Sequence, residues 1–215
     1  MKRRIIDVYQ GNGFISWARA GAYIDGAILK ACNGDNEDTS WDFNSRRMLA
    51  AGVPLLGAYQ FWLTGATTAS VLLRTIGPNV CPMGDFEPPA TAVINAAQVG
   101  AWMTSMDPQA LRVSGSLAPF YSGMPYLQQF IMNKDGSWPD WMISRPLWLA
   151  EYPNEIVFGP TFDQFNPAHY SYSKPHLPTG WKSWPGQPWL WQLSPRGIIP
   201  GIAGNQVDLS IDWPA

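Results

Sequence analysis

Short apolar runs alternate with helix-like stretches over residues 4–132 of the chain. A short apolar run bounded by turn residues predicts a buried strand. The runs predict strands over residues 4–8, 25–30, 54–61, 80–87 and 117–121. Strands that alternate with helices, at roughly 30 residues for each strand–helix unit, are typical of a parallel sheet with crossover helices.

The stretches between these strands carry helix signals. Thr39 and Asp42 have the spacing of a capping box, and Gly52 is a suitable stop for the helix that this box would open. Helices are expected over residues 17–22, 39–52, 67–76, 92–106 and 125–132, of which 92–106 is the best candidate.

The alternation ends towards the C-terminus. Three further strands are predicted over residues 147–152, 189–193 and 206–211, but the segment 153–188 is rich in proline, aromatic and polar residues and has no helical period. No linker or internal repeat marks a second domain. We therefore predict one α/β domain over residues 1–215, an irregular TIM-like (β/α)5(β)3 barrel with its active site at the C-terminal ends of the strands.

Composition narrows the class of protein. Charged residues make up 14% of the chain, below the roughly 25% of an average soluble domain, which excludes charge-driven disorder. The net charge of −2, with lysine and arginine scattered, makes nucleic acid an unexpected partner. No run of 18 apolar residues is present, so no membrane span is expected.

Targeting and redox signals are weak. The basic start of the chain resembles the first part of a signal peptide, but Asp7 and Gln10 interrupt the apolar stretch that should follow, so no signal peptide is expected. Cys32 and Cys81 match neither a Cys-x-x-Cys pair nor a zinc pattern, and two buried free thiols are favoured over a disulfide.

The sharpest chemical feature is the pair Asp85 and Glu87 at the end of a predicted strand. Side chains two residues apart in a strand share a face, so both carboxylates should enter one pocket while Phe86 faces the helices. Close like charges and partial burial raise a carboxyl pKa, which would keep one group protonated as a general acid. A solvated strand end is the alternative for an isolated Asp-x-Glu.

Two further acids belong to the same rim. Asp7 ends the first predicted strand and Asp208 lies in the last, and barrel closure makes these strands neighbours. Four acids would then line one mouth. Such a cluster is typical of either a magnesium or calcium site or a glycosidase site.

Aromatic side chains favour the carbohydrate alternative. Sugar rings stack on aromatic planes, so a groove lined by such residues would hold a glycan, although tryptophan and tyrosine also fill cores and rims. His169 and His176 fit no metal-binding helix, and no nucleophile elbow is present. The aromatic residues at or near predicted strand ends are Tyr9, Tyr59, Phe61, Tyr121, Trp148, Tyr152 and Trp191.

An ordered set of motifs resembles the lysozymes of glycoside hydrolase family 25, the Chalaropsis-type muramidases. The resemblance covers nearly the whole chain. The matching motifs are Ile6-Asp7-Val8-Tyr9-Gln10-Gly11, Ile15-Ser16-Trp17, Ala27-Ile28-Leu29-Lys30-Ala31, Ala51-Gly52-Val53-Pro54, Gly57-Ala58-Tyr59-Gln60-Phe61, the Asp85 and Glu87 pair, Pro146-Leu147-Trp148-Leu149-Ala150, Trp191-Gln192, Ile199-Pro200-Gly201-Ile202 and Val207-Asp208-Leu209.

The resemblance implies a barrel of eight strands and five helices that cleaves the β-1,4 bond between N-acetylmuramic acid and N-acetylglucosamine in peptidoglycan. It implies Glu87 as general acid, Asp85 as stabiliser of the developing positive charge in a substrate-assisted route, and Asp7 and Asp208 as supporting acids. It implies no cofactor and no metal. The expected substrate-binding residues are Tyr9, Tyr59, Gln60, Phe61, Tyr121, Trp148, Tyr152 and Trp191.

Some positions depart from the family pattern. The family often has histidine where Gln60 stands, Cys32-Asn33-Gly34 replaces a Thr-Glu-Gly type of run, and the segment 153–188 is long. A catalytically silent carbohydrate-binding or virion-structural barrel and a metal-dependent hydrolase therefore remain as alternatives. The leading hypothesis is a muramidase that acts as a monomer. Because no export signal is expected, a phage endolysin that reaches the bacterial wall from the host cytoplasm or within a virion is the hypothesis for its biological setting.

Overall fold

A computed structural model describes residues 3–64, 66, 68–89, 91–152, 189–204 and 206–212. The predictions made for the segment 153–188, including those for His169 and His176, lie outside the described residues.

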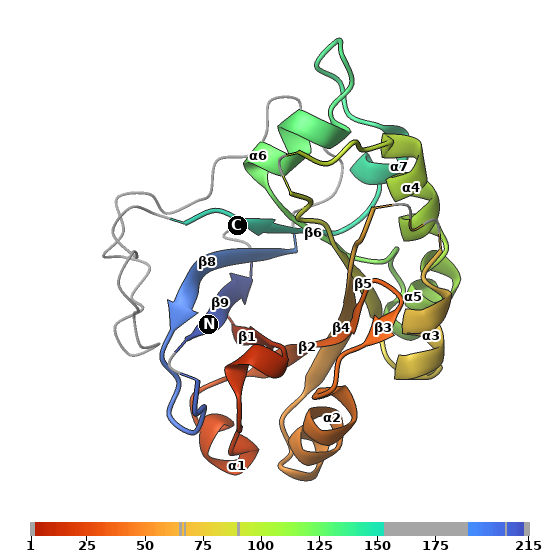
Figure 1. The fold of residues 1–215 in the computed structure, drawn as a ribbon. Helices are drawn as coiled ribbons and strands as arrows, with labels where there is room; N and C mark the ends of the chain where they lie inside the picture. The colour runs from red at the N-terminus through yellow and green to blue at the C-terminus, as the bar shows by residue number, and fades with distance from the viewer. Residues whose placement is uncertain are drawn as a thin grey trace.

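The described residues form one closed barrel (Figure 1). Each predicted strand is present, and the pairing of the first strand with the second closes the sheet in the order β1-β9-β8-β7-β6-β5-β4-β2. A short strand that the sequence did not predict, β3, extends the edge of β2. The strands are β1 (Arg4–Val8), β2 (Gly26–Asn33), β3 (Asn36–Glu37), β4 (Leu55–Phe61), β5 (Pro82–Asp85), β6 (Phe120–Gly123), β7 (Leu147–Ala150), β8 (Leu190–Gly197) and β9 (Val207–Asp212).

The last strand runs against its neighbours. Strands β1, β2 and β4 to β8 pair in parallel, whereas β9 is antiparallel to both β8 and β1. The cause is the short connection between Gly197 and Val207, because a parallel return needs a crossover of a dozen or more residues. The predicted irregular α/β barrel is confirmed, with one antiparallel strand.

Helices follow the first strands and lie outside the barrel wall (Figure 1). The helix expected over residues 92–106 is shorter in the structure, where α4 spans Ala96–Thr104. A second helix that the sequence did not predict, α5, follows it and has Pro108 in its first turn. The helical segments are η1 (Gln10–Asn12), α1 (Trp17–Ala20), α2 (Trp41–Ala50), α3 (Ser70–Ile76), α4 (Ala96–Thr104), α5 (Asp107–Ser114), α6 (Met124–Tyr126), η2 (Leu127–Ile131) and α7 (Asp140–Ile143).

The expected capping box is wrong. Ser40 is the residue that precedes α2, and its side chain makes no capping hydrogen bond. Thr39 instead donates its hydroxyl hydrogen to Gln10 Oε1 at 2.8 Å. The Thr39 hydroxyl, which the local pattern predicted to cap the helix, therefore makes a tertiary contact with Gln10 instead.

The layer between barrel and helices is aromatic. Phe86 is fully buried, and its ring centroid lies 5.3 Å from that of Trp62 and 5.9 Å from that of Phe120. Phe86 thus faces away from the barrel interior, as expected from strand alternation. At Gly84 an added Cβ would overlap Met103 and the Trp102 ring, so the missing side chain allows α4 to pack closely on β5.

Both cysteines are buried free thiols, as the sequence favoured. Burial raises the pKa of the Cys32 thiol to about 11, so this thiol is not a ready nucleophile. Within the described ranges, no helix has the length and apolar character needed to cross a bilayer.

Candidate active site

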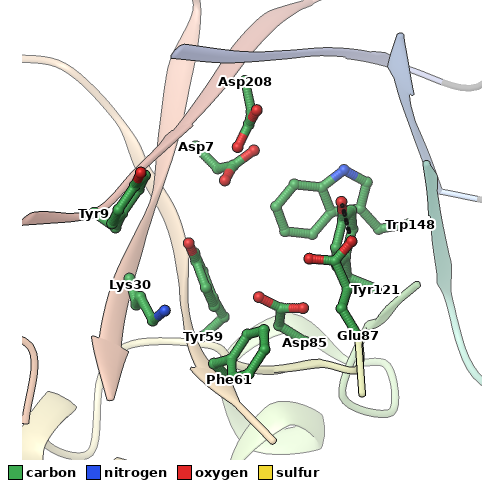
Figure 2. A pocket seen from close by; sticks show the side chains of 10 residues that line it. All are labelled: Asp7, Tyr9, Lys30, Tyr59, Phe61, Asp85, Glu87, Tyr121, Trp148 and Asp208. Atoms are coloured by element: carbon green, nitrogen blue, oxygen red, sulfur yellow. Dashed lines mark hydrogen bonds between the residues drawn. The ribbon is translucent and has the colours of Figure 1, made fainter. Parts of the chain in front are cut away.

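A cavity of about 190 Å³ opens at the C-terminal ends of the parallel strands (Figure 2). It brings together residues that are up to 201 positions apart, because the parallel strands end at this rim and the antiparallel strand β9 begins there. The lining side chains are Asp7, Tyr9, Lys30, Tyr59, Phe61, Asp85, Glu87, Tyr121, Trp148 and Asp208.

Asp7 and Asp208 face each other across paired strands (Figure 2). Asp7 lies near the end of β1 and Asp208 near the start of β9, and the antiparallel register sets them directly opposite. Burial, followed by the Asp208 charge, raises the pKa of Asp7 well above its usual range. Burial also raises the pKa of Asp208 to about 6, so the two carboxyl groups share a proton near neutral pH.

Asp85 and Glu87 enter the same cavity from the end of β5. Asp85 is 6% exposed, and its Oδ1 is buried without a hydrogen-bond partner among the described residues. Burial, followed by the Glu87 charge, raises the pKa of Asp85, and Lys30 opposes this shift. For Glu87, burial and then the Asp208 charge raise the pKa, so this carboxyl holds its proton to higher pH than an exposed glutamate does.

Gln192 joins several of these groups, and the sequence analysis did not select it as a site residue. Tyr121 donates its hydroxyl hydrogen to Gln192 Oε1 at 2.6 Å, and Tyr152 donates to the same oxygen at 2.8 Å. Gln192 Nε2 donates to Asp7 Oδ2 at 3.4 Å. The signal in the sequence that could have identified Gln192 was its polar side chain within the apolar run of strand β8.

Lys30 is a second residue that the sequence analysis missed. Its ammonium lies 4.7 Å from the ring centroid of Phe61, 5.7 Å from that of Tyr9 and 6.0 Å from that of Tyr59. These contacts hold a positive charge on the wall of an acidic cavity. The signal was a lysine inside the apolar strand formed by residues 26–33.

Three of the expected binding residues do not line this cavity. Gln60 is fully buried on the outer face of β4, where Trp102 Nε1 donates to its Oε1 and its Nε2 donates to the Gly34 carbonyl. Trp191 is 2% exposed and donates its Nε1 hydrogen to the Glu151 carbonyl. These two side chains were expected to contact sugar, but neither lines this cavity, because strand alternation turns each of them away from its inward-facing neighbours.

Tyr152 lies just beyond β7 and is 42% exposed. Its hydroxyl group connects it to the site by donating to Gln192. The other expected aromatic residues, Tyr9, Tyr59, Phe61, Tyr121 and Trp148, do line the cavity.

Metal ligation was the alternative chemistry for the acid cluster. Over the part of the chain that the structure describes, no group of three or more histidine, cysteine, aspartate or glutamate residues is arranged to hold a metal ion.

The buried acids make stability depend on pH. Since the pKa of Asp208 is about 6 in the folded chain against an ordinary 3.8, the folded state binds this proton more tightly than the unfolded state. Stability is therefore lost as pH rises through this window. We expect Asp208→Asn to leave the melting temperature almost unchanged at about pH 4 and to raise it above that of the wild type at about pH 7.5.

Thermal melts followed by circular dichroism at both pH values test this prediction. Asp35→Asn, on an exposed residue, is the matched control and should leave both melting temperatures unchanged. An equal effect of Asp208→Asn at the two pH values would exclude a buried charge as the cause.

No protein-family model matches the sequence, and no curated protein matches it. Solved structures do match over nearly the full chain. A bacterial lysozyme from Streptomyces coelicolor has a TM-score of 0.70 at 20% identity, covering 99% of this chain and 92% of the lysozyme. A family GH25 lysozyme from Aspergillus fumigatus has a TM-score of 0.66 at 18% identity, covering 100% and 95%.

A third similar structure is the catalytic domain of an endolysin from a bacteriophage of Listeria monocytogenes. Its TM-score is 0.62 at 13% identity, and the match covers 100% of this chain and 94% of that domain. The described chain therefore has the fold of the family 25 lysozymes, as its motifs led us to expect.

Proposed function

We propose that this protein is a muramidase that hydrolyses the β-1,4 bond between N-acetylmuramic acid and N-acetylglucosamine in bacterial peptidoglycan. The observation that carries the proposal is the convergence of Asp7, Asp85, Glu87 and Asp208 in one cavity at the rim of the barrel. The shared fold of known lysozymes supports the same reaction. Oxygen ligands alone would also suit a metal, but glycosidic cleavage needs a protonated carboxyl group, and the raised pKa of Glu87 supports this role.

Glu87 would be the general acid. Burial raises its pKa, so it holds its proton to higher pH than an exposed glutamate does, and it is less deeply buried than Asp85. In the first step Glu87 transfers this proton to the glycosidic oxygen as the bond from that oxygen to the anomeric carbon breaks.

The substrate's own acetamido group would act as nucleophile. As the glycosidic bond breaks, the acetamido carbonyl oxygen attacks the anomeric carbon and forms a cyclic oxazolinium ion. Asp85 would accept the acetamido N–H and stabilise the positive charge through its unpaired Oδ1. Water then attacks the anomeric carbon as the bond from that carbon to the acetamido oxygen breaks, which restores the acetamido group. The water gives a proton to the Glu87 carboxylate, which restores the acid.

The remaining residues would position the sugar. Tyr59, Phe61, Tyr121 and Trp148 offer aromatic surface for the apolar faces of the rings. Asp208 would favour the protonated state of Glu87 through its negative charge, while Asp7 would hold the proton that the pair shares. One chain contributes all four acids, so a monomer is sufficient for this chemistry.

Digestion of purified peptidoglycan tests the proposed reaction. The wild type should release fragments whose new reducing ends are muramic acid, as identified by mass spectrometry after borohydride reduction. Because the acetamido group takes part, peptidoglycan without N-acetyl groups on its muramic acid should be cleaved at least about 100-fold more slowly. Two successive displacements at the anomeric carbon should also give a product of retained configuration.

Each other outcome points elsewhere. New reducing ends on N-acetylglucosamine would indicate a glucosaminidase, and an absence of new reducing ends would favour the silent carbohydrate-binding or virion-structural barrel. Full activity on the N-deacetylated wall would exclude the substrate-assisted route.

We also propose a phage setting, in which the protein reaches the wall from the host cytoplasm or within a virion. The structural similarity to a phage endolysin domain supports this setting. Detection of the protein in the culture fluid of an intact host that lacks phage genes would contradict it.

A further inference from the structure

The buried amide of Gln192 has one favourable orientation. The side chain is 2% exposed, and its Oε1 accepts hydrogen bonds from both Tyr121 and Tyr152. Its Nε2 faces Asp7 Oδ2 at 3.4 Å. A flipped amide would turn its Nε2 hydrogens towards the two tyrosine hydroxyl groups and remove their shared acceptor, so the acceptor side stays on the tyrosines and the donor side stays on Asp7.

The Tyr121 hydroxyl has one hydrogen and three acceptors within reach: Gln192 Oε1, Glu87 Oε1 and the Tyr152 oxygen. Gln192 Oε1 lies at 2.6 Å and Glu87 Oε1 at 3.4 Å from the hydroxyl oxygen. The shorter contact takes the hydrogen, because hydroxyl hydrogen bonds are strongest near 2.7 Å. The Tyr121 oxygen therefore presents a lone pair to Glu87.

A lone pair facing a carboxyl group selects its protonation state. Protonated Glu87 can donate its hydrogen to the Tyr121 oxygen, whereas an ionised Glu87 would meet that oxygen lone pair to lone pair. The contact thus favours the protonated state that a general acid needs.

We propose that Gln192 is a positioning residue of the active site, which accepts the Tyr121 hydroxyl hydrogen and thereby turns the Tyr121 oxygen into an acceptor for the Glu87 proton. This inference rests on the proposed function for its catalytic meaning, but the hydrogen-bond arrangement can be tested without activity. Gln192 itself lies behind Tyr121 and is not among the residues that line the cavity.

Other charged and titratable groups also face Glu87. Burial and the Asp208 charge favour its proton, and Lys30 opposes it. A hydrogen bond donated by the Tyr121 hydroxyl would lower the pKa of Glu87 as well, and this is the hydrogen that Gln192 draws away. Tyr121 differs from the other groups because its hydroxyl hydrogen is held by the Gln192 amide. We expect that removal of this amide turns the hydrogen towards Glu87. The groups are Lys30 on β2, Asp85 on β5, Tyr121 on β6, Tyr126 on α6, Tyr152 after β7 and Asp208 on β9, with Asp7 on β1 beyond Asp208.

The decisive variant is Gln192→Met, which keeps the length of the side chain and removes its acceptor. The Tyr121 hydroxyl then turns and donates to Glu87, which stabilises the carboxylate. We expect the pKa of Glu87 to fall by roughly one unit. Carbon-13 NMR of protein labelled at the glutamate side-chain carboxyl, with Glu87 assigned by Glu87→Gln, measures this pKa directly.

The same change should appear in catalysis. The alkaline limb of the pH profile of kcat/KM should move to lower pH by the same amount, since this limb reports the acid of the free enzyme. A merely structural role would lower kcat/KM at every pH and leave the limb in place.

Two further variants separate this effect from general disturbance. In a Tyr121→Phe background, Gln192→Met should no longer shift the pKa of Glu87, because no hydroxyl remains to turn. Gln192→Asn retains a buried amide but draws its oxygen away from Tyr121, and it should lower the pKa in the same direction if the methionine variant does not fold. Gln98→Met, on the exposed side of α4, is the matched control.

An unchanged or raised pKa of Glu87 in the Gln192 variants would overturn the inference, and so would a shift that persists without the Tyr121 hydroxyl. Failure of the wild type to cut peptidoglycan would instead overturn the proposed function, while the NMR titration would still decide the hydrogen-bond arrangement.

Discussion

Replacing Glu87 with glutamine should reduce the rate of peptidoglycan cleavage by about 100-fold to 10⁴-fold, the contribution usual for a general acid. Glutamine has nearly the same shape and can occupy the same place, but it has no proton to give to the leaving oxygen. Reducing ends released from purified cell walls, measured at several pH values, give kcat/KM. The variant should also lose the alkaline limb that Glu87 produces in the wild type.

The fold should survive this change. Removing a buried carboxyl that repels Asp208 should leave the melting temperature equal to or above that of the wild type at neutral pH. Glu37→Gln, on the exposed strand β3, is the matched control and should retain full activity. Full activity of Glu87→Gln would remove Glu87 from the role of acid.

The second large effect concerns stability. Arg145 is 2% exposed, and its guanidinium binds Asp107 through two contacts, Nη1 to Oδ1 at 3.0 Å and Nη2 to Oδ2 at 3.2 Å. Arg145 also donates to the carbonyls of Trp141 and Ala118. These bonds connect the start of α5, the end of α7 and the chain that leads into β6, the strand that carries Tyr121.

Arg145→Met should lower the free energy of unfolding by about 3–5 kcal/mol, because it leaves the Asp107 carboxylate buried without its partner. Urea denaturation followed by tryptophan fluorescence measures the loss. Adding Asp107→Asn to this variant should recover part of the stability, since asparagine carries no charge and its oxygen can still accept from the Ala118 N–H.

A surface pair provides the comparison. Arg46 contacts Asp42 at 2.6 Å with both side chains largely exposed, so Arg46→Met should cost no more than about 1 kcal/mol. If Arg46→Met and Arg145→Met lowered the free energy of unfolding equally, burial would not be the reason for the large effect of Arg145→Met.

The elements of the fold could be predicted where a local pattern decides them. The apolar runs from Arg4 and from Leu147 gave strands that begin at those residues, and the Asp85 and Glu87 pair entered one cavity as the period of two requires. Local pattern failed at Thr39, whose hydroxyl group binds a residue of another loop.

The binding residues were harder to predict than the acids. Gln60 and Trp191 lie next to inward-facing residues in the sequence, yet each points outward into a packed layer. Lys30 and Gln192 were read only as parts of motifs, and their contacts involve three other strands of the barrel, β1, β4 and β6. A side chain's neighbours across a barrel are not encoded by its neighbours along the chain.

By itself, the sequence determined which segments become strands, which acids emerge from strand ends and which family the motifs resemble, since these depend on local periodicity and spacing. Only the tertiary structure decided that β9 runs antiparallel, which sets Asp208 opposite Asp7, and that the Tyr121 hydroxyl lies between Gln192 and Glu87. The physical reason is that hydrogen-bond partners and buried charges are fixed by closure of the barrel, which brings distant segments into contact and removes water from between them.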